Sequence, residues 1–171
     1  MLAIFNTLVE ICVLRRGPQD LPRSVSWTVL AAVAFAVAFV AQAWIAGVPD
    51  NSLAQAALDL TLSTAVTAGL LHWRGLGGRL PQTLLGLFGT GVILNLISAP
   101  LARWALDESA AEPVRGVAFA GLIVLIVWNL AIVAHIYRNA LNISFAHGVF
   151  IAIAYFIVWM QLNVLLFPPP A

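Results

Sequence analysis

The chain has no lysine, a single cysteine and few charges of either sign. Of its 171 residues 9% are charged, and eight arginines against seven acidic residues give a formal net charge of +1. A nucleic-acid surface needs clustered basic residues, so this balance argues against a nucleic-acid partner. Because Cys12 is alone, an internal disulfide and a cysteine-based metal cluster are both excluded.

Catalytic motifs are also missing. The sequence holds no Gly-x-Ser-x-Gly nucleophile elbow and, without lysine, no phosphate-binding loop of the Gly-x-x-x-x-Gly-Lys kind. We therefore expect a protein that is not an enzyme and that holds no cofactor.

Apolar residues dominate instead. They make up 62% of the chain, and the mean hydropathy is +0.99, which is typical of an integral membrane protein. About 20 apolar residues of helix cross a hydrocarbon core of about 30 Å. Five stretches meet that length: residues 26–46, 52–73, 82–104, 116–137 and 144–167. The sequence thus predicts an all-α polytopic bundle of five transmembrane helices.

Helix breakers separate these stretches. Gly47 and Pro49 end the first, and Ser52 is the expected N-cap of the second. Pro81 suits the first turn of the third, whereas Pro100 near its end predicts a bend. The connections are too short for an extramembrane domain, so we expect a cytoplasmic segment over 1–24, a membrane domain over 25–167 and a short outer tail over 168–171.

The arginines predict an orientation. Six fall in segments on one side of the predicted membrane: Arg15, Arg16, Arg23, Arg74, Arg79 and Arg138. Only Arg103 and Arg115 fall on the other side. Since arginines near span ends are retained in the cytoplasm, this split places the N-terminus inside and the C-terminus outside.

The segment Met1 to Arg16 is apolar apart from one polar stripe, and it is too short to span. We expect an amphipathic helix in the cytoplasmic interface, with Arg15, Arg16 and Arg23 at lipid headgroups. The alternative is a secretion signal cleaved after Ala43, although span one is longer than the apolar region of a usual signal.

Asp59 lies two turns inside the second span, where a charge is costly and usually has a partner. Counting helical rise places several polar residues at similar depth or on the same side, and they form a predicted intramembrane polar cluster. Its members are Asp59, Asn95, Gln42, Gln161 and Asn163. Either the carboxyl group locks spans two and three together by a hydrogen bond, or it is a proton or ion site. Asn129 in span four is expected to form an interhelical hydrogen bond.

Small residues gather in spans two and three: Ser63, Thr67, Gly86, Gly89, Thr90 and Gly91. Such residues let helix backbones approach closely in lipid, which predicts packing within one bundle. A hinge or a homodimer face is the alternative.

The three histidines, His72, His135 and His147, all fall on the predicted cytoplasmic side. Imidazole nitrogens ligate haem iron or metal ions, so a converging set is a candidate metal site. However, no His-x-x-x-His, Glu-x-x-His or Cys-x-x-Cys-His spacing accompanies them, and solvated interfacial histidines are the alternative.

Three segments carry a resemblance. They are Leu14 to Ser24, the Leu58-Asp59-Leu60 triplet, and Pro81 to Gly91. Together they resemble a set of small proteobacterial inner-membrane proteins with five spans. The plan of a short N-terminus followed by five spans is distantly similar to the Ypt-interacting protein (Yip) family, which implies membrane trafficking with small GTPases as partners. This chain lacks the long cytoplasmic N-terminal region that would support such a role, and neither group has a catalytic motif that matches here.

These features predict a multi-pass protein of the bacterial inner membrane that acts as a Yip-like, non-enzymatic scaffold or accessory subunit. Its expected partners are the lipid bilayer and other membrane proteins or a second copy. Two alternatives stay open: a small transporter or ion-coupled channel component that uses Asp59, and a haem- or quinone-linked redox subunit that uses the histidines. The sequence shows no internal repeat, which weakens the transporter alternative.

Overall fold

The computed structural model of the protein describes residues 2–168, and its regular structure within that range is helical, with no strand. The helices are α1 (Leu2–Cys12), α2 (Val25–Ala46), α3 (Ser52–Trp73), α4 (Leu80–Leu106), α5 (Glu112–Leu141) and α6 (Phe145–Leu166). Two short 3₁₀ turns, η1 (Pro18–Asp20) and η2 (Gly77–Arg79), precede α2 and α4. Met1 and residues 169–171, which hold most of the predicted outer tail, lie outside the described range.

Helices α2 to α6 are long and apolar enough to cross a membrane. This confirms the all-α class and five candidate spans. The boundaries agree closely with the sequence-based ranges, and the largest difference is in α5, which begins at Glu112 and ends at Leu141. The longer α5 follows from Pro113 in its first turn, a position that proline favours, and from the burial of Ala140 and Leu141 in its last turn.

Local chemistry accounts for most helix ends. Ser24 Oγ accepts a hydrogen bond from the Trp27 amide at the start of α2, and Gly47 ends α2 with φ +81°, which suits glycine. Pro81 lies in the first turn of α4, as predicted. The prediction that Ser52 is the N-cap of α3 is wrong. Asn51 holds that position with φ 59°, a left-handed conformation that asparagine tolerates, and Ser52 is the first helical residue.

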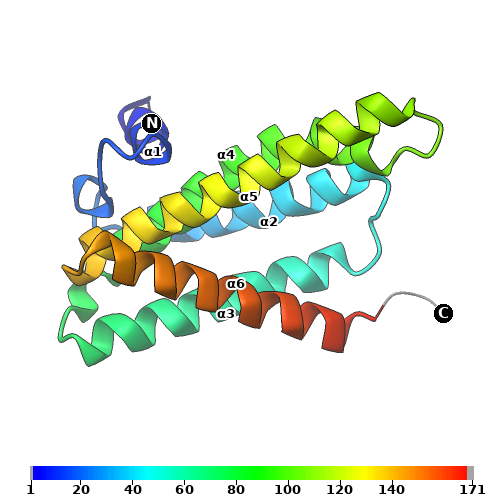
Figure 1. The fold of residues 1–171 in the computed structure, drawn as a ribbon. Coiled ribbons are helices and arrows are strands. Elements are labelled where there is room, and N and C mark those ends of the chain that lie inside the picture. The colour runs from blue at the N-terminus through cyan, green and yellow to red at the C-terminus, as the bar shows by residue number, and fades with distance from the viewer. Residues whose placement is uncertain (1, 169–171) are drawn as a thin grey trace.

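The long helices form two layers (Figure 1). In one layer α4 packs extensively against both α2 and α5, and in the other α3 and α6 run side by side. The layers converge at the end where α5 turns into α6, called the α5–α6 end below, and they diverge toward the end where α2 connects to α3, called the α2–α3 end (Figure 1).

The α5–α6 end is closed by packing and by hydrogen bonds. Leu71 of α3 forms a buried cluster with Tyr137, Ala140 and Leu141 of α5. Arg79 Nη1 donates to the carbonyl oxygen of Ala140 at 2.9 Å, where the last turn of α5 leaves carbonyls without helical partners. These contacts hold the two layers together at this end.

Helix α1 crosses the long helices rather than running along them (Figure 1). Leu8, Ile11 and Cys12 are buried against α4 and α5, and the indole Nε1 of Trp128 donates to the Cys12 carbonyl at 2.8 Å. The helix ends at Cys12 and does not continue to Arg16, because Leu14 adopts a left-handed φ of 60° and the chain turns. The interfacial position of α1 stays a prediction.

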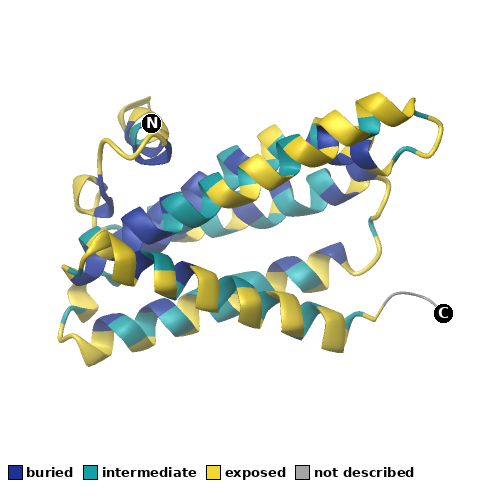
Figure 2. Cartoon of the chain, viewed as in Figure 1, coloured by how far each residue is buried: buried dark blue, intermediate teal, exposed yellow. Residues whose placement is uncertain are grey.

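Burial is uneven across the two layers (Figure 2). In the most apolar 18 residues of α4, 50% of positions are buried inside the protein, against 6% in α6 and 11% in α3. Helix α4 is therefore the central helix. Helices α3 and α6 leave most of their apolar surface for lipid to cover.

Candidate functional site

A cavity of about 550 Å³ lies between the two layers, and all five long helices line it. Its size is in the usual range of small-molecule pockets, about 300–1,000 Å³. Most of its wall is apolar. The polar lining residues are Gln42, Gln55, Asp59, Asn95, Ser98, Asn129, Tyr155 and Trp159.

Asp59 is held by two hydroxyl groups. Tyr155 of α6 donates its hydroxyl to Asp59 Oδ1, and Ser63, one turn further along α3, donates to the same oxygen at 3.2 Å. The Ser63 and Tyr155 hydroxyl oxygens are themselves 2.8 Å apart. The carboxyl group therefore ties α3 to α6, and not to α4 as the pairing of spans two and three predicted.

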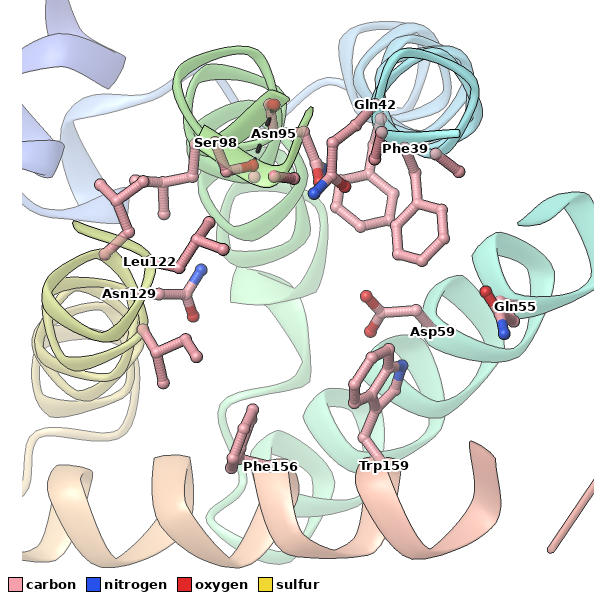
Figure 3. A pocket seen from close by; sticks show the side chains of 18 of the residues that line it. Phe39, Gln42, Gln55, Asp59, Asn95, Ser98, Leu122, Asn129, Phe156 and Trp159 are labelled. Carbon is pink, nitrogen blue, oxygen red and sulfur yellow. Dashed lines mark hydrogen bonds between the residues drawn. The ribbon is translucent and has the colours of Figure 1, made fainter. Parts of the chain in front are cut away.

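Only one of the two carboxyl oxygens is used in this way. Asp59 Oδ2 has no hydrogen-bond partner within residues 2–168, and the carboxyl group points into the cavity (Figure 3). A carboxylate oxygen keeps acceptor sites for further donors or a cation. The site thus presents one free acidic oxygen to the cavity.

Amide side chains reach the cavity from the opposite layer. Gln42 of α2, Asn95 of α4 and Asn129 of α5 all point toward it (Figure 3). Ser98 Oγ donates to the main-chain carbonyl of Asn95 at 3.0 Å, which leaves the Asn95 amide group itself for the cavity. Their donors and acceptors are directed at the space in which a ligand would lie.

Trp159 adds a donor to this set. Its ring packs on Phe156, with ring centroids 6.4 Å apart and an interplanar angle of 21°. The indole Nε1 is buried and has no hydrogen-bond partner within residues 2–168. A buried indole N–H usually has an acceptor, so the wall of the cavity contains an unsatisfied donor.

The structure brings together three members of the predicted polar cluster: Asp59, Asn95 and Gln42. The other two do not line the cavity. Gln161 is exposed, because it is two positions past Trp159 and thus about 200° round the helix. Asn163 lies one turn beyond the cavity and donates to the Trp159 carbonyl at 3.0 Å on its own helix. The depth of a residue along a span does not determine which way its side chain faces.

Several site residues were missed by the sequence reasoning, or given another role. Asn129, expected to bond between helices, lines the cavity, as do Gln55, Ser98 and Tyr155. One signal for Tyr155 exists in the sequence. A tyrosine in the middle of a span needs a partner for its hydroxyl group, and an acid at matching depth is the natural candidate.

The small residues of α3 and α4 make contacts inside the chain. A Cβ atom on Gly89 would lie 2.6 Å from Leu8 of α1, and one on Gly91 would lie 2.7 Å from Phe35 of α2. Gly86 faces Leu21, and Thr90 Oγ1 donates to the Gly86 carbonyl at 2.8 Å. This stretch of α4 is covered by α1 and α2, so packing within one bundle accounts for it. On α3, Thr67 Oγ1 and Tyr137 Oη are hydrogen-bonded at 3.0 Å.

The arginines expected at headgroups differ in their contacts. Arg15 is exposed, whereas Arg16 Nε forms an ion pair with Glu10 at 2.6 Å. Arg23 Nε donates to Gln82 Oε1 at 3.1 Å and so links the start of α2 to α4. Headgroup binding by these residues stays a prediction.

The histidines occupy three separate environments. His72 is exposed, His147 Nδ1 is hydrogen-bonded to Ser144 Oγ at 2.7 Å, and His135 Nε2 donates to the Arg16 carbonyl at 2.9 Å. Within residues 2–168, no three His, Cys, Asp or Glu side chains lie close enough to share a metal ion.

Comparison with family models, curated proteins and solved structures finds no match to the chain. The proteobacterial and Yip resemblances therefore stay predictions, and the chemistry of the cavity has to carry the functional interpretation.

Proposed function

We propose that the protein binds a small molecule inside the membrane, as a small transporter or an ion-coupled channel component that uses Asp59. One observation carries this proposal: the cavity of about 550 Å³ has Asp59 at its wall and polar side chains from all five long helices directed into it. This was the second of the three functions that the sequence suggested.

The cavity favours this function over a scaffold or accessory subunit. A scaffold uses its outer surface, and its interior gains stability from close packing. Unfilled volume forfeits those contacts, and polar groups directed into it lose hydrogen bonds. A ligand that fills the volume and bonds to these groups gives both features a purpose. The accessory-subunit role and the inner-membrane location stay predictions.

The shape of the cavity supports entry from one side. Its lining extends to Val48 in the α2–α3 connection and to Leu106 at the end of α4. At the α5–α6 end, the cluster around Leu71 and the Thr67–Tyr137 hydrogen bond close the bundle. In the orientation that the arginines predict, the open end faces outward, so the ligand enters from the outer side.

Thiol labelling tests whether the cavity is open to water and solutes. A Ser98→Cys substitution in a Cys12→Ser background places one thiol in the cavity wall. N-ethylmaleimide reacts with the thiolate, which forms in water and not in hydrocarbon. We expect labelling at Ser98→Cys in membranes. The matched control is Val37→Cys, 64% exposed on the lipid-facing side of α2, which should react slowly.

Equally slow labelling of the Ser98 and Val37 variants would overturn the proposal, because a ligand cannot enter a volume that water does not reach. Because the reagent, the Cys12→Ser background and the membrane are the same for both variants, only the location of the thiol differs between them.

A further inference from the structure

We infer that the cavity binds a lipophilic organic cation, with the positive group beside Asp59 and the apolar part among the aromatic rings of α2 and α6. The inference rests on the proposed function and names its class of ligand. It follows from the charge of the cavity, from the arrangement of rings around it, and from its volume.

The charge of the cavity favours a cation. Among the described residues that line the cavity, Asp59 is the only acid, and no arginine or histidine accompanies it. A cationic partner stabilises a carboxylate in a low-dielectric site. Arg103 lies beside Gly47, and its guanidinium is paired with Asp107 at 3.9 Å. A positively charged ligand supplies the missing partner, and an anion has no basic group to bind.

The α2–α3 end also favours cations. Its connections and adjoining helix ends carry four acidic residues against two arginines: Asp50, Asp107, Glu108 and Glu112 against Arg103 and Arg115. All the other arginines lie toward the α5–α6 end or in the N-terminal segment. A negative rim raises the local concentration of positively charged solutes at the entrance.

The aromatic rings lie on opposite walls. Phe35 and Phe39 of α2 form a pair with centroids 6.1 Å apart, and Phe156 and Trp159 of α6 form a second pair. Figure 3 shows Phe39 on one side of the cavity, Phe156 and Trp159 on the other, and the Asp59 carboxyl group at the same cavity. Ring faces attract ammonium groups, and tryptophan does so best. Rings together with one carboxylate form the recognition chemistry of an alkylated or protonated amine.

Volume and composition separate an organic cation from a metal ion. A hard inorganic cation takes six or more oxygen ligands at short distance. The cavity has one carboxylate and amides that project from separate helices into about 550 Å³ of mainly carbon-lined space. That space fits a molecule with a substantial apolar body, and it is far larger than a bare ion.

Three benzyl compounds of similar size test the inference. They are benzyltrimethylammonium, its neutral carbon isostere neopentylbenzene, and the anion benzylsulfonate. Binding to the purified full chain in lipid nanodiscs is measured by calorimetry, with empty nanodiscs subtracted. We expect the cation to bind at least about tenfold more tightly than the neutral isostere, and the anion not to bind.

Asp59→Asn then separates charge from shape. The amide oxygen still accepts hydrogen bonds from Tyr155 and Ser63, so the helix contact is kept while the negative charge is removed. We expect the affinity for benzyltrimethylammonium to fall at least about tenfold and that for neopentylbenzene to stay the same. Asp50→Asn, which removes one negative charge from the α2–α3 connection, is the matched control and should change cation affinity far less.

Trp159 provides a second variant that does not alter charge. Trp159→Leu should weaken cation binding by roughly fivefold, and Trp159→Phe should retain most of it, because phenylalanine keeps a ring face. This pattern separates an aromatic contact with the cation from general packing.

The outcomes distinguish the two proposals. Equal binding of the cation and its neutral isostere, or full cation affinity in Asp59→Asn, overturns the cation inference and leaves an apolar ligand for the cavity. Absence of binding by all three probes also overturns it. In each of these cases labelling of Ser98→Cys still supports the proposed function, whereas absence of that labelling removes both proposals.

Discussion

At the scale of single residues, the contact between Asp59 and Tyr155 joins the two helices of one layer. It joins α3 to α6, which otherwise have few contacts, and Ser63 supports the same carboxyl oxygen. Interhelical hydrogen bonds in a bilayer contribute about 0.6 to 1.7 kcal/mol each. We therefore expect this polar contact to contribute measurably to the stability of the α3–α6 pair.

Tyr155→Phe removes the hydroxyl group and keeps the ring. We expect the free energy of unfolding to fall by about 1 kcal/mol, with a similar fall for Asp59→Leu and a smaller one for Asp59→Asn, whose amide still accepts. The double variant Tyr155→Phe with Asp59→Leu should lose less than the two single losses added together. Unfolding by sodium dodecyl sulfate in mixed micelles measures all four proteins.

The control for this series is Thr64→Val, because the exposed Thr64 hydroxyl bonds only to the Leu60 carbonyl of its own helix. It should leave stability nearly unchanged. Fully additive losses for Tyr155 and Asp59 would contradict a direct contact between them.

Cys12 shows how packing of α1 controls reactivity. Burial raises the pKa of its thiol from 9.0 to about 11, so far less thiolate is present near neutral pH than for an ordinary cysteine. We expect N-ethylmaleimide at pH 8 to modify Cys12 about a hundredfold more slowly than a cysteine at the exposed position Val13 in a Cys12→Ser background. Mass spectrometry of timed samples measures both rates.

The same shift gives a pH dependence with a definite sign. Because the folded protein holds this proton more tightly than the unfolded chain, the stabilising contribution is complete below pH 9 and is lost as pH rises toward 11. Rapid labelling of Cys12 at pH 8 would contradict the packing of α1 on α4 and α5.

At the scale of helices, Gly148 sets the approach of α6 to α5. A Cβ atom at this position would lie 2.3 Å from the main-chain carbonyl oxygen of Ala134, and a main-chain atom cannot move aside as a side chain can. Glycine is required here because the two backbones touch, which is how small residues act between membrane helices.

Gly148→Ala should therefore force α6 away from α5 and lower the free energy of unfolding by about 1 to 3 kcal/mol. Gly69→Ala is the matched control. It makes the same substitution inside another span, at a position where an added Cβ meets nothing within 4 Å. Unfolding in mixed micelles compares the two variants. An equal effect of both substitutions would mean that loss of glycine itself, rather than the α5–α6 contact, accounts for the change.

At the scale of the whole molecule, five spans would place the two termini on opposite sides of the membrane. The arginine distribution predicts that the N-terminus is inside and the C-terminus outside. A reporter that is active only in the cytoplasm should work when fused after Arg79 or within residues 139–142. It should fail after Asp50, after Glu108 or at the C-terminus.

Activity of the C-terminal fusion together with inactivity after Arg79 would show the opposite orientation, in which the cavity opens to the cytoplasm. Activity of both would remove the five-span topology. The reporter series thus tests the side from which a ligand enters, independently of what the ligand is.

The number and limits of the spans could be predicted from the sequence, because the length of an apolar run is a one-dimensional property. A hydrocarbon core of fixed thickness converts that length directly into a helix, and glycine and proline mark the ends. The end of α2 at Gly47 and the first turn of α4 at Pro81 follow from local chemistry alone. The candidate site could also be predicted in part, because an acidic residue within a span is unusual whichever way its side chain points.

Which residues meet Asp59 was decided only by the tertiary structure. In a soluble protein the apolar face of a helix marks the side that is buried, but lipid is as apolar as a helix interface, so α3 and α6 carry almost no amphipathic pattern to fix their rotation. The sequence reasoning therefore predicted Gln161 for the polar cluster, although it is exposed, and did not indicate Tyr155. The cavity lies between α3 and α6 and the other layer, and the close approach of Gly148 to Ala134 joins residues that no sequence pattern pairs.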